Sequence, residues 1–168
     1  CIGELTGDVL YDRGSSPFPL APRPGITFRY GTSAPSSVAS IGDSVFWLAK
    51  DKDGIGVVVQ TVGFQPQPIS DKSLETAIST YARMASIDNA EGLTYEEDGH
   101  QFYVLHFPSV PATHVYDLST QVWHSRGKWN APINSYDLWP ARVHTLAFGK
   151  HVVLDHMTGN INQMSVSM

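Results

Sequence analysis

The feature that most limits the fold of this chain is a unit of strand, turn and strand that recurs three times. Each copy opens with a glycine in a turn-forming context, runs on as a short apolar strand, and continues through a polar turn into another strand. The glycines and the apolar runs that follow them are Gly42 with 45–48, Gly99 with 102–105, and Gly149 with 152–154. The polar turns read DKDGIGV, DLSTQVW and DHMTGNI, and the middle copy carries an extra HFPSVPAT before its turn. Repetition of this kind predicts small antiparallel sheets that stack on one another.

A short antiparallel sheet cannot bury its own faces, so the repeat favours sheets that pack face to face around an axis. We therefore predict an all-β fold, a β-propeller-like fragment of antiparallel blades with one short helix. Two or three such units can be counted in the sequence, fewer than the roughly four to eight blades of a closed ring. A β-sandwich is the alternative fold.

The expected organisation is a single propeller-like domain fragment over residues 1–168, about the length of one domain. Four prolines within residues 14–25 predict an extended connector or surface arm, because proline ends helices and cannot donate to a central strand. Blade-like hairpins are expected at 37–70, 93–126 and 143–168, with a tight turn at 50–54 in the first of them. The chain begins with Cys1 and its first residues already alternate like a strand, so we expect it to be a piece of a longer protein.

Residues 71–85 are the exception to the β pattern. Leu74, Ile78 and Tyr81 recur at helical spacing and form one apolar stripe. Asp71 precedes the stripe as a plausible N-cap. We predict a helix here whose role is packing, since its polar face carries only ordinary solvated side chains.

Composition and charge exclude several classes of function. The formal net charge is −5, and the 11 Lys and Arg residues form no cluster larger than the Arg126-Gly127-Lys128 triplet, so sequence-specific nucleic-acid binding is not expected. One cysteine allows neither an internal disulfide nor a cysteine-based zinc site. No apolar run approaches the roughly 20 residues of a membrane span, and no secretory signal opens the chain. The composition is that of a mildly acidic domain compatible with the cytosol.

Catalytic and metal sites are not expected either. No two histidines show the helical i, i+4 spacing of a zinc site, and strand edges and turns are the expected places for all seven. They are His100, His106, His114, His124, His144, His151 and His156. There is no G-x-S-x-G nucleophile motif, and the acids Glu96, Glu97 and Asp98 precede a glycine as in a solvated turn. We predict no catalytic, cofactor-binding or metal-binding residue and no enzymatic activity.

Aromatic residues divide into two groups. Trp47 and Trp123 occupy strand positions, where core packing is the expected role. Trp129, Tyr136 and Trp139 lie in an irregular, proline-containing loop between two repeat units. Exposed aromatic residues in loops are favoured anchors of protein interfaces, so these three residues are the candidate interface. A sugar-stacking platform is the other use of such residues.

Several segments together resemble the packaged-DNA stabilisation proteins of short-tailed phages, which are also called tail accessory or tail hub proteins and are carried by prophages too. The likeness covers most of residues 31–164 and is weakest over the first 30 residues. Its most specific parts are an Ile-Ser linker with the helix that follows, the strand G-H-x-F-Y-V-L-x-x-P at 99–108, and V-Y-D-L-S-T-x-x-W-H at 115–124.

The resemblance implies a virion structural protein with a β-propeller-like body. Such a protein would sit as a homo-oligomeric ring between the portal-side adaptor and the tail needle or spikes. Its partners would be other tail and head-completion proteins, with assembly in the host cytoplasm, and it would retain packaged DNA by plugging and assembly, without a cofactor. Two alternatives remain open: a carbohydrate-binding or glycan-processing β-propeller, and a kelch-like intracellular interaction domain.

Overall fold

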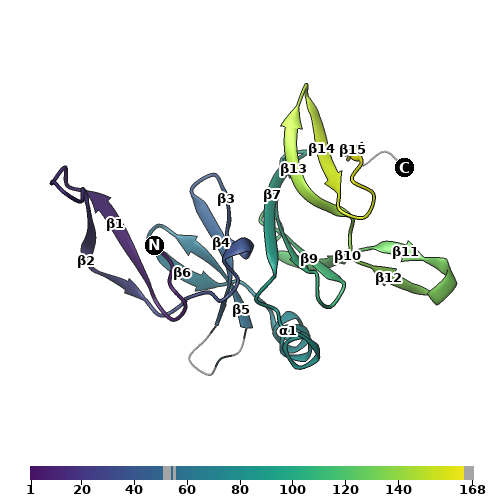
Figure 1. Ribbon diagram of the computed structural model, residues 1–168, viewed down its shortest axis with the longest axis horizontal. Coiled ribbons are helices and arrows are strands. Elements are labelled where there is room, and N and C mark those ends of the chain that lie inside the picture. The colour runs from purple at the N-terminus through teal and green to yellow at the C-terminus, as the bar shows by residue number, and fades with distance from the viewer. Residues whose placement is uncertain (51–53, 55, 165–168) are drawn as a thin grey trace.

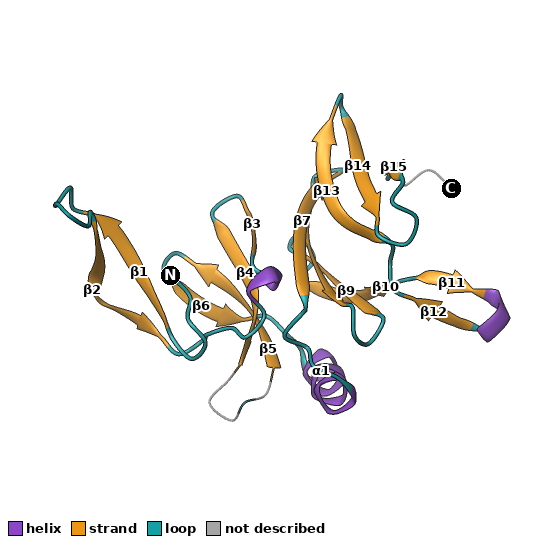
Figure 2. Ribbon diagram, in the orientation of Figure 1, coloured by secondary structure: helices purple, strands orange, loops and turns teal. Residues whose placement is uncertain are grey.

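The computed structural model of the protein describes residues 1–50, 54 and 56–164. These residues form five antiparallel sheets, here numbered in chain order, and one α-helix (Figure 1). Sheets 1, 2, 3 and 5 lie one beside the next in a curved row, and sheet 4 is a small hairpin that projects at the C-terminal side (Figure 2). The tight turn predicted at 50–54 lies largely outside the described residues.

The strands follow one another in spatial order within every sheet. Sheet 1 consists of β1 (Gly7–Asp12) and β2 (Leu20–Phe28). Sheet 2 consists of β3 (Ala39–Ile41), β4 (Ser44–Lys50), β5 (Gly56–Val62) and β6 (Gln65–Pro68). Sheet 3 consists of β7 (Glu91–Glu97), β8 (His100–Phe107), β9 (Ala112–Asp117) and β10 (Val122–Arg126). Sheet 4 pairs β11 (Lys128–Asn130) with β12 (Ser135–Asp137), and sheet 5 consists of β13 (Ala141–Ala147), β14 (Lys150–Asp155) and β15 (Ile161–Gln163). Short 3-10 turns occupy η1 (Pro35–Ser37) and η2 (Ala131–Ile133).

The three repeat glycines occupy equivalent places in three different sheets. Gly42, Gly99 and Gly149 each lie in the turn between the first and second strands of sheets 2, 3 and 5. Their φ angles are 55°, 78° and 70°, a left-handed conformation that a residue with a Cβ rarely adopts. The repeat seen in the sequence is therefore a structural repeat.

Alternation along the central strands shows how the sheets stack. In β4, Phe46 and Leu48 face one apolar cluster, whereas Trp47 and Ala49 face another on the opposite side of the sheet. Strand β8 behaves in the same way, because its odd-numbered residues 103, 105 and 107 pack toward sheet 2, whereas Val104 packs in a third cluster with Leu93 and Val115. Central strands buried on both faces require layers on both sides. The fold is therefore a series of stacked blades that does not close, as predicted, and not a two-layer β-sandwich.

Helix α1 (Lys72–Met84) matches the predicted packing helix. The Asp71 carboxylate accepts a hydrogen bond from the Leu74 backbone N–H at 2.7 Å, which caps the first turn. Leu74 and Ile78 are buried in the cluster between sheets 2 and 3. Gly56 lets the helix come close, since a Cβ there would lie 2.4 Å from the Ile78 side chain. The helix is too short and too polar to cross a membrane.

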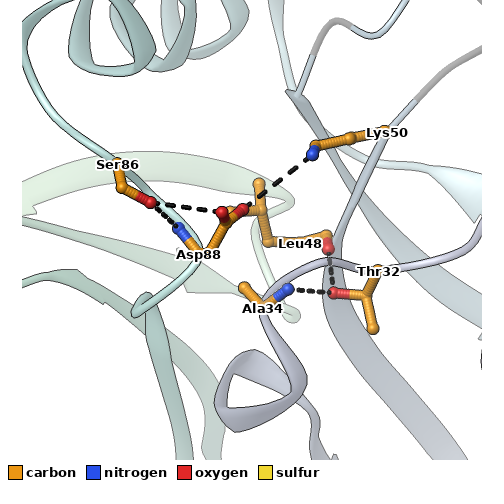
Figure 3. Close-up of polar contacts among 6 residues, drawn as sticks. All are labelled: Thr32, Ala34, Leu48, Lys50, Ser86 and Asp88. Atoms are coloured by element: carbon orange, nitrogen blue, oxygen red, sulfur yellow. Dashed lines mark hydrogen bonds and ion pairs between the residues drawn. The ribbon is translucent and has the colours of Figure 1, made fainter. Parts of the chain in front are cut away.

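Polar contacts fasten the connecting segments to sheet 2 (Figure 3). The Thr32 hydroxyl donates to the Leu48 carbonyl at 2.7 Å and accepts from the Ala34 N–H at 3.0 Å, so the segment after β2 is bonded to β4. Past α1, the Asp88 carboxylate lies 3.9 Å from the Lys50 ammonium. Both connections are therefore held against the same strand.

The predicted connector at 14–25 is shorter than expected. Strand β2 begins at Leu20 and includes Pro22 and Pro24. Among the described residues β2 pairs only with β1, so it is an edge strand, where a proline without an N–H breaks no ladder on the open side. The proline-rich stretch therefore contributes a strand as well as a connection.

Candidate protein interface

The predicted interface residues lie on and next to the hairpin of sheet 4, where a loop was expected. Trp129 on β11 is directly opposite Tyr136 on β12, and their rings meet edge to face at 5.0 Å. The Asn130 side-chain amide donates to the Asp137 carboxylate at 2.8 Å and closes the same pair of strands. Cross-strand aromatic pairing stabilises short hairpins of this kind. The proline-containing sequence did not indicate that this segment forms a hairpin.

The three aromatic residues differ in exposure. Trp129 is 51% and Tyr136 65% exposed, which is unusual for side chains of this size. Ile133 at the tip of the hairpin is 62% exposed. Trp139 is half-buried, and its ring lies over the His106 imidazole with 5.9 Å between centroids. The hairpin thus presents an apolar surface, and Trp139 belongs to its base.

A cleft of about 560 Å³ opens between this hairpin and the ends of sheets 3 and 5. Its lining residues are Glu97, Ser125, Arg126, Gly127, Tyr136, Trp139 and Met164. The structure therefore brings Tyr136 and Trp139 together on one cleft, with Trp129 beside Tyr136. Gly127 allows the hairpin to fold back at this point, because a Cβ there would lie 2.7 Å from the Asp137 carbonyl oxygen.

Arg126, which the sequence reasoning did not select, is the central polar residue of the cleft. Its guanidinium carbon lies 5.6 Å from the ring centroids of Tyr95 and Phe102 and 5.2 Å from that of Trp139. Cation–π contacts of this kind hold a guanidinium in place. The sequence places Arg126 and Lys128 next to the aromatic residues of the loop, but this does not distinguish one basic residue from the other.

The Tyr95 hydroxyl lies in the same region and has no hydrogen-bond partner among the described residues. Burial raises the pKa of this phenol, and the positive charge of Arg126 partly opposes that rise. The hydroxyl is one of two buried side-chain groups in the described part of the chain that lack a partner.

The histidines are placed differently from the prediction in two cases. His106 is buried in the central strand β8, and burial lowers its pKa to about 4. Its Nδ1 lies 2.9 Å from the Thr113 hydroxyl. His114 on β9 is paired with the Tyr81 hydroxyl at 3.1 Å. Strand-edge positions were expected, but β8 and β9 are the inner strands of sheet 3 and are covered on both faces.

The remaining candidates for chemistry are dispersed. His100 pairs with Asp117 at 2.8 Å, and His144 with His151 at 2.9 Å. Within the described ranges, no three residues of the His, Cys, Asp and Glu types lie close enough together to hold a metal ion. Asp98 forms the turn before Gly99 with a positive φ, in agreement with the solvated turn expected there.

The two core tryptophans are placed as predicted. Trp47 is fully buried between sheets 1 and 2. Trp123 packs against Tyr103 and Tyr116, and its indole N–H donates to the Ile69 carbonyl at 2.8 Å. Both residues thus stabilise contacts between layers and do not offer a binding platform.

Stacked antiparallel sheets that do not close define a fold of the β-propeller class. A family model described as "Bacteriophage P22 Gp10, beta-propeller" matches residues 1–168 of the chain. The chain belongs to this family of phage stabilisation proteins, whose members stabilise packaged DNA as structural components of the virion. No curated protein sequence matches the chain closely enough to count as a relative.

Proposed function

We propose that this protein is a tail hub or head-completion component that helps to retain packaged DNA. In this proposal it assembles as a homo-oligomeric ring between the portal-side adaptor and the tail needle or spikes. Assembly takes place in the host cytoplasm, and the finished ring is part of the virion. The observation that carries the proposal is the match of the phage stabilisation family over the whole chain.

The surface of the molecule supports retention by assembly over retention by a grip on phosphates. The net charge of −5 opposes close contact with a polyanion, since nucleic-acid binding relies on Lys and Arg contacts to phosphates. Trp129 and Tyr136, by contrast, expose the kind of side chain that anchors protein interfaces. We assign the contact with a neighbouring tail protein to the sheet 4 hairpin and the base residue Trp139. No catalytic residue is needed for this role.

Co-assembly with the adaptor tests the proposal. The protein and the portal-side adaptor encoded in the same phage or prophage genome should elute together from a size-exclusion column. The double substitution Trp129→Ala and Tyr136→Ala should weaken the complex by about tenfold or more, as expected for aromatic anchors. Val62→Ala is the matched control, because Val62 is equally exposed at 62% but lies on sheet 2.

Two results would count against this function. One is the absence of co-elution between the unmodified protein and the adaptor. The other is a gene neighbourhood of sugar-uptake genes instead of portal, adaptor and tail-needle genes. Unchanged co-elution of the double variant would leave the hub role intact and remove the hairpin from its interface.

A further inference from the structure

The guanidinium of Arg126 is fixed by aromatic rings from three separate parts of the fold. Tyr95 belongs to β7, Phe102 to β8, and Trp139 to the segment after β12. All three ring centroids lie between 5.2 and 5.6 Å from the guanidinium carbon. Such contacts attract the cation electrostatically and do not require its N–H groups to donate hydrogen bonds. The side chain is therefore held in a defined position mainly by its contacts with the rings.

Those donors are largely unused within the described part of the chain. The Arg126 side chain forms no ion pair with a described residue, and its one polar side-chain contact there is with the Tyr95 hydroxyl, which is too loose to satisfy that phenol. Arg142 provides the contrast, because both of its guanidinium contacts go to the carboxylate of Glu91 across the junction of sheets 3 and 5. Glu97 lines the same cleft as Arg126 without forming an ion pair with it.

The rest of the cleft combines polar and apolar lining. Tyr136 and Trp139 supply aromatic surface, Met164 supplies a flexible apolar side chain, and Ser125 adds a hydroxyl. The hydroxyl of Ser125 has only a long contact of 3.5 Å, to Nδ1 of His114. A ligand that fits would bring two acceptor oxygens to the guanidinium and an apolar group to the rings.

We infer that this cleft binds a carboxylate side chain of a partner protein, with an aromatic or aliphatic neighbour of that carboxylate packed on Tyr136 and Trp139. A carboxylate accepts two parallel N–H···O bonds from a guanidinium, a strong and directional pairing. The inference rests on the proposed function, since it names the chemistry of the partner at the same surface. The aromatic and methionine lining favours a protein side chain over a nucleic-acid phosphate, whose neighbouring phosphates would place further negative charge against a protein of net charge −5.

Short peptides test the inference without any phage partner. The probes are the blocked peptides Gly-Phe-Glu-Phe-Gly and Gly-Phe-Gln-Phe-Gly, which differ only in the charge of the central side chain. Both are titrated into the isotope-labelled 168-residue protein by NMR. The Glu peptide should shift the Arg126 Nε–H, the Gly127 amide and the Trp139 indole N–H, and should bind about tenfold more tightly than the Gln peptide.

Variants make the assignment specific. Arg126→Gln should reduce the affinity for the Glu peptide to that for the Gln peptide, and Arg126→Lys should recover only part of the difference, because an ammonium lacks the paired donors. Arg83→Gln is the control, since Arg83 lies on the last turn of α1, away from the cleft. If Arg126→Gln does not fold, the inference is still tested by the affinities of the two peptides for the unmodified protein and for Arg126→Lys.

Equal affinities for the two peptides, or shifts that avoid Arg126, would overturn the inference. So would tighter binding of the corresponding Lys peptide, which would assign the site to Glu97. These outcomes leave the hub proposal standing if the protein still co-elutes with the adaptor. Failure of co-elution with a positive peptide result would instead reject the hub and keep the carboxylate site.

Discussion

His144 and His151 share a hydrogen bond within sheet 5, with Nε2 of His144 2.9 Å from Nδ1 of His151. Both rings lie against Tyr95 of sheet 3, at 5.5 and 6.3 Å between centroids. The junction of sheets 3 and 5 thus contains a titratable pair, whereas the cluster between sheets 2 and 3 is built from apolar and aromatic side chains. We expect acid to act first on the junction of sheets 3 and 5.

The pair predicts a lowered pKa for His144 that depends on its neighbour. Burial lowers this pKa, and the charge of a protonated His151 lowers it further. In a proton NMR titration, the His144 ring should protonate below the usual range for histidine. His151→Asn should move the midpoint upward, since it removes the second cause and leaves the first. A midpoint that does not respond to His151→Asn would show that the two rings do not interact in solution.

His106 predicts a loss of stability in acid. Its pKa falls from 6.5 to about 4 on burial, so the unfolded chain binds this proton more readily than the folded one. The free energy of unfolding therefore has its full value above the pKa that His106 has in the unfolded chain. It decreases as the pH falls toward about 4, the pKa of His106 in the folded protein. Between neutral pH and about pH 5 the loss is on the order of 2 kcal/mol. Urea unfolding at both values should show it, with a shallower pH dependence for His106→Gln.

That expectation is checked by comparing the slopes of stability against pH, because the substitution also changes the stability by an amount that does not depend on pH. Gln can still pair with the Thr113 hydroxyl but does not titrate in this range. An unchanged slope in His106→Gln would assign the acid sensitivity to other residues. His114, His124 and His144, whose pKa values burial also lowers, are then the next to substitute.

Leu105 should be among the most sensitive positions for stability. Its side chain is fully buried in the cluster that joins sheets 2 and 3 beneath α1. Leu105→Ala removes buried methyl groups and leaves a cavity, so the free energy of unfolding should fall by about 2–5 kcal/mol. Val122→Ala is the control on the same sheet, because Val122 is 55% exposed and should cost about 0.5 kcal/mol or less. Similar losses in both variants would contradict the layered core.

Gly92 and Gly99 should respond differently to alanine. A Cβ at Gly92 would lie 2.1 Å from the backbone carbonyl oxygen of Ser37, so β7 and η1 would have to separate. Gly99 faces open space, and only its positive φ of 78° opposes a side chain, at about 1 kcal/mol. Thermal unfolding should therefore show the larger loss for Gly92→Ala. The reverse order would mean that the close approach of β7 to η1 is not maintained in solution.

The layered β architecture was predictable because its signals are local. Turn glycines with apolar runs behind them define the first hairpin of sheets 2, 3 and 5, and the helical spacing of Leu74, Ile78 and Tyr81 interrupts that pattern once. The alignment of the middle repeat was wrong, however. The turn D-L-S-T-Q joins the third and fourth strands of sheet 3, whereas D-H-M-T-G joins the second and third strands of sheet 5. The stretch treated as an insertion, HFPSVPAT, holds the turn at 108–111 that corresponds by position.

The candidate site was predictable only in part. The preference of protein interfaces for aromatic residues in loops selects Trp129, Tyr136 and Trp139 from the sequence. Arg126 could not be selected, because its environment is built from Tyr95 and Phe102, residues 24 to 31 positions earlier in the chain. The burial of His106 likewise depends on a layer that covers sheet 3. Sequence patterns report on single strands, whereas these properties arise from contacts between sheets.

The misaligned turn leads to a last prediction, because D-L-S-T-Q and D-H-M-T-G share one local geometry. In each, the fifth residue donates its N–H to the carbonyl of the aspartate at 2.8 Å and has a positive φ. The Asp117 carboxylate also accepts from the Ser119 N–H at 2.8 Å, from the Thr120 hydroxyl at 2.9 Å, and lies 2.8 Å from Nδ1 of His100.

Asp117→Ala should therefore cost about 1–3 kcal/mol of the free energy of unfolding, since three groups lose their acceptor. Asp155→Ala is the matched variant, because the Asp155 carboxylate accepts from Met157 and Thr158 but has no histidine partner, and this variant should cost less. Asp117→Asn should recover part of the loss, because its amide oxygen still accepts. Chemical denaturation of the three variants measures the series, and an Asp155→Ala variant as damaging as Asp117→Ala would show that the bond to His100 adds nothing.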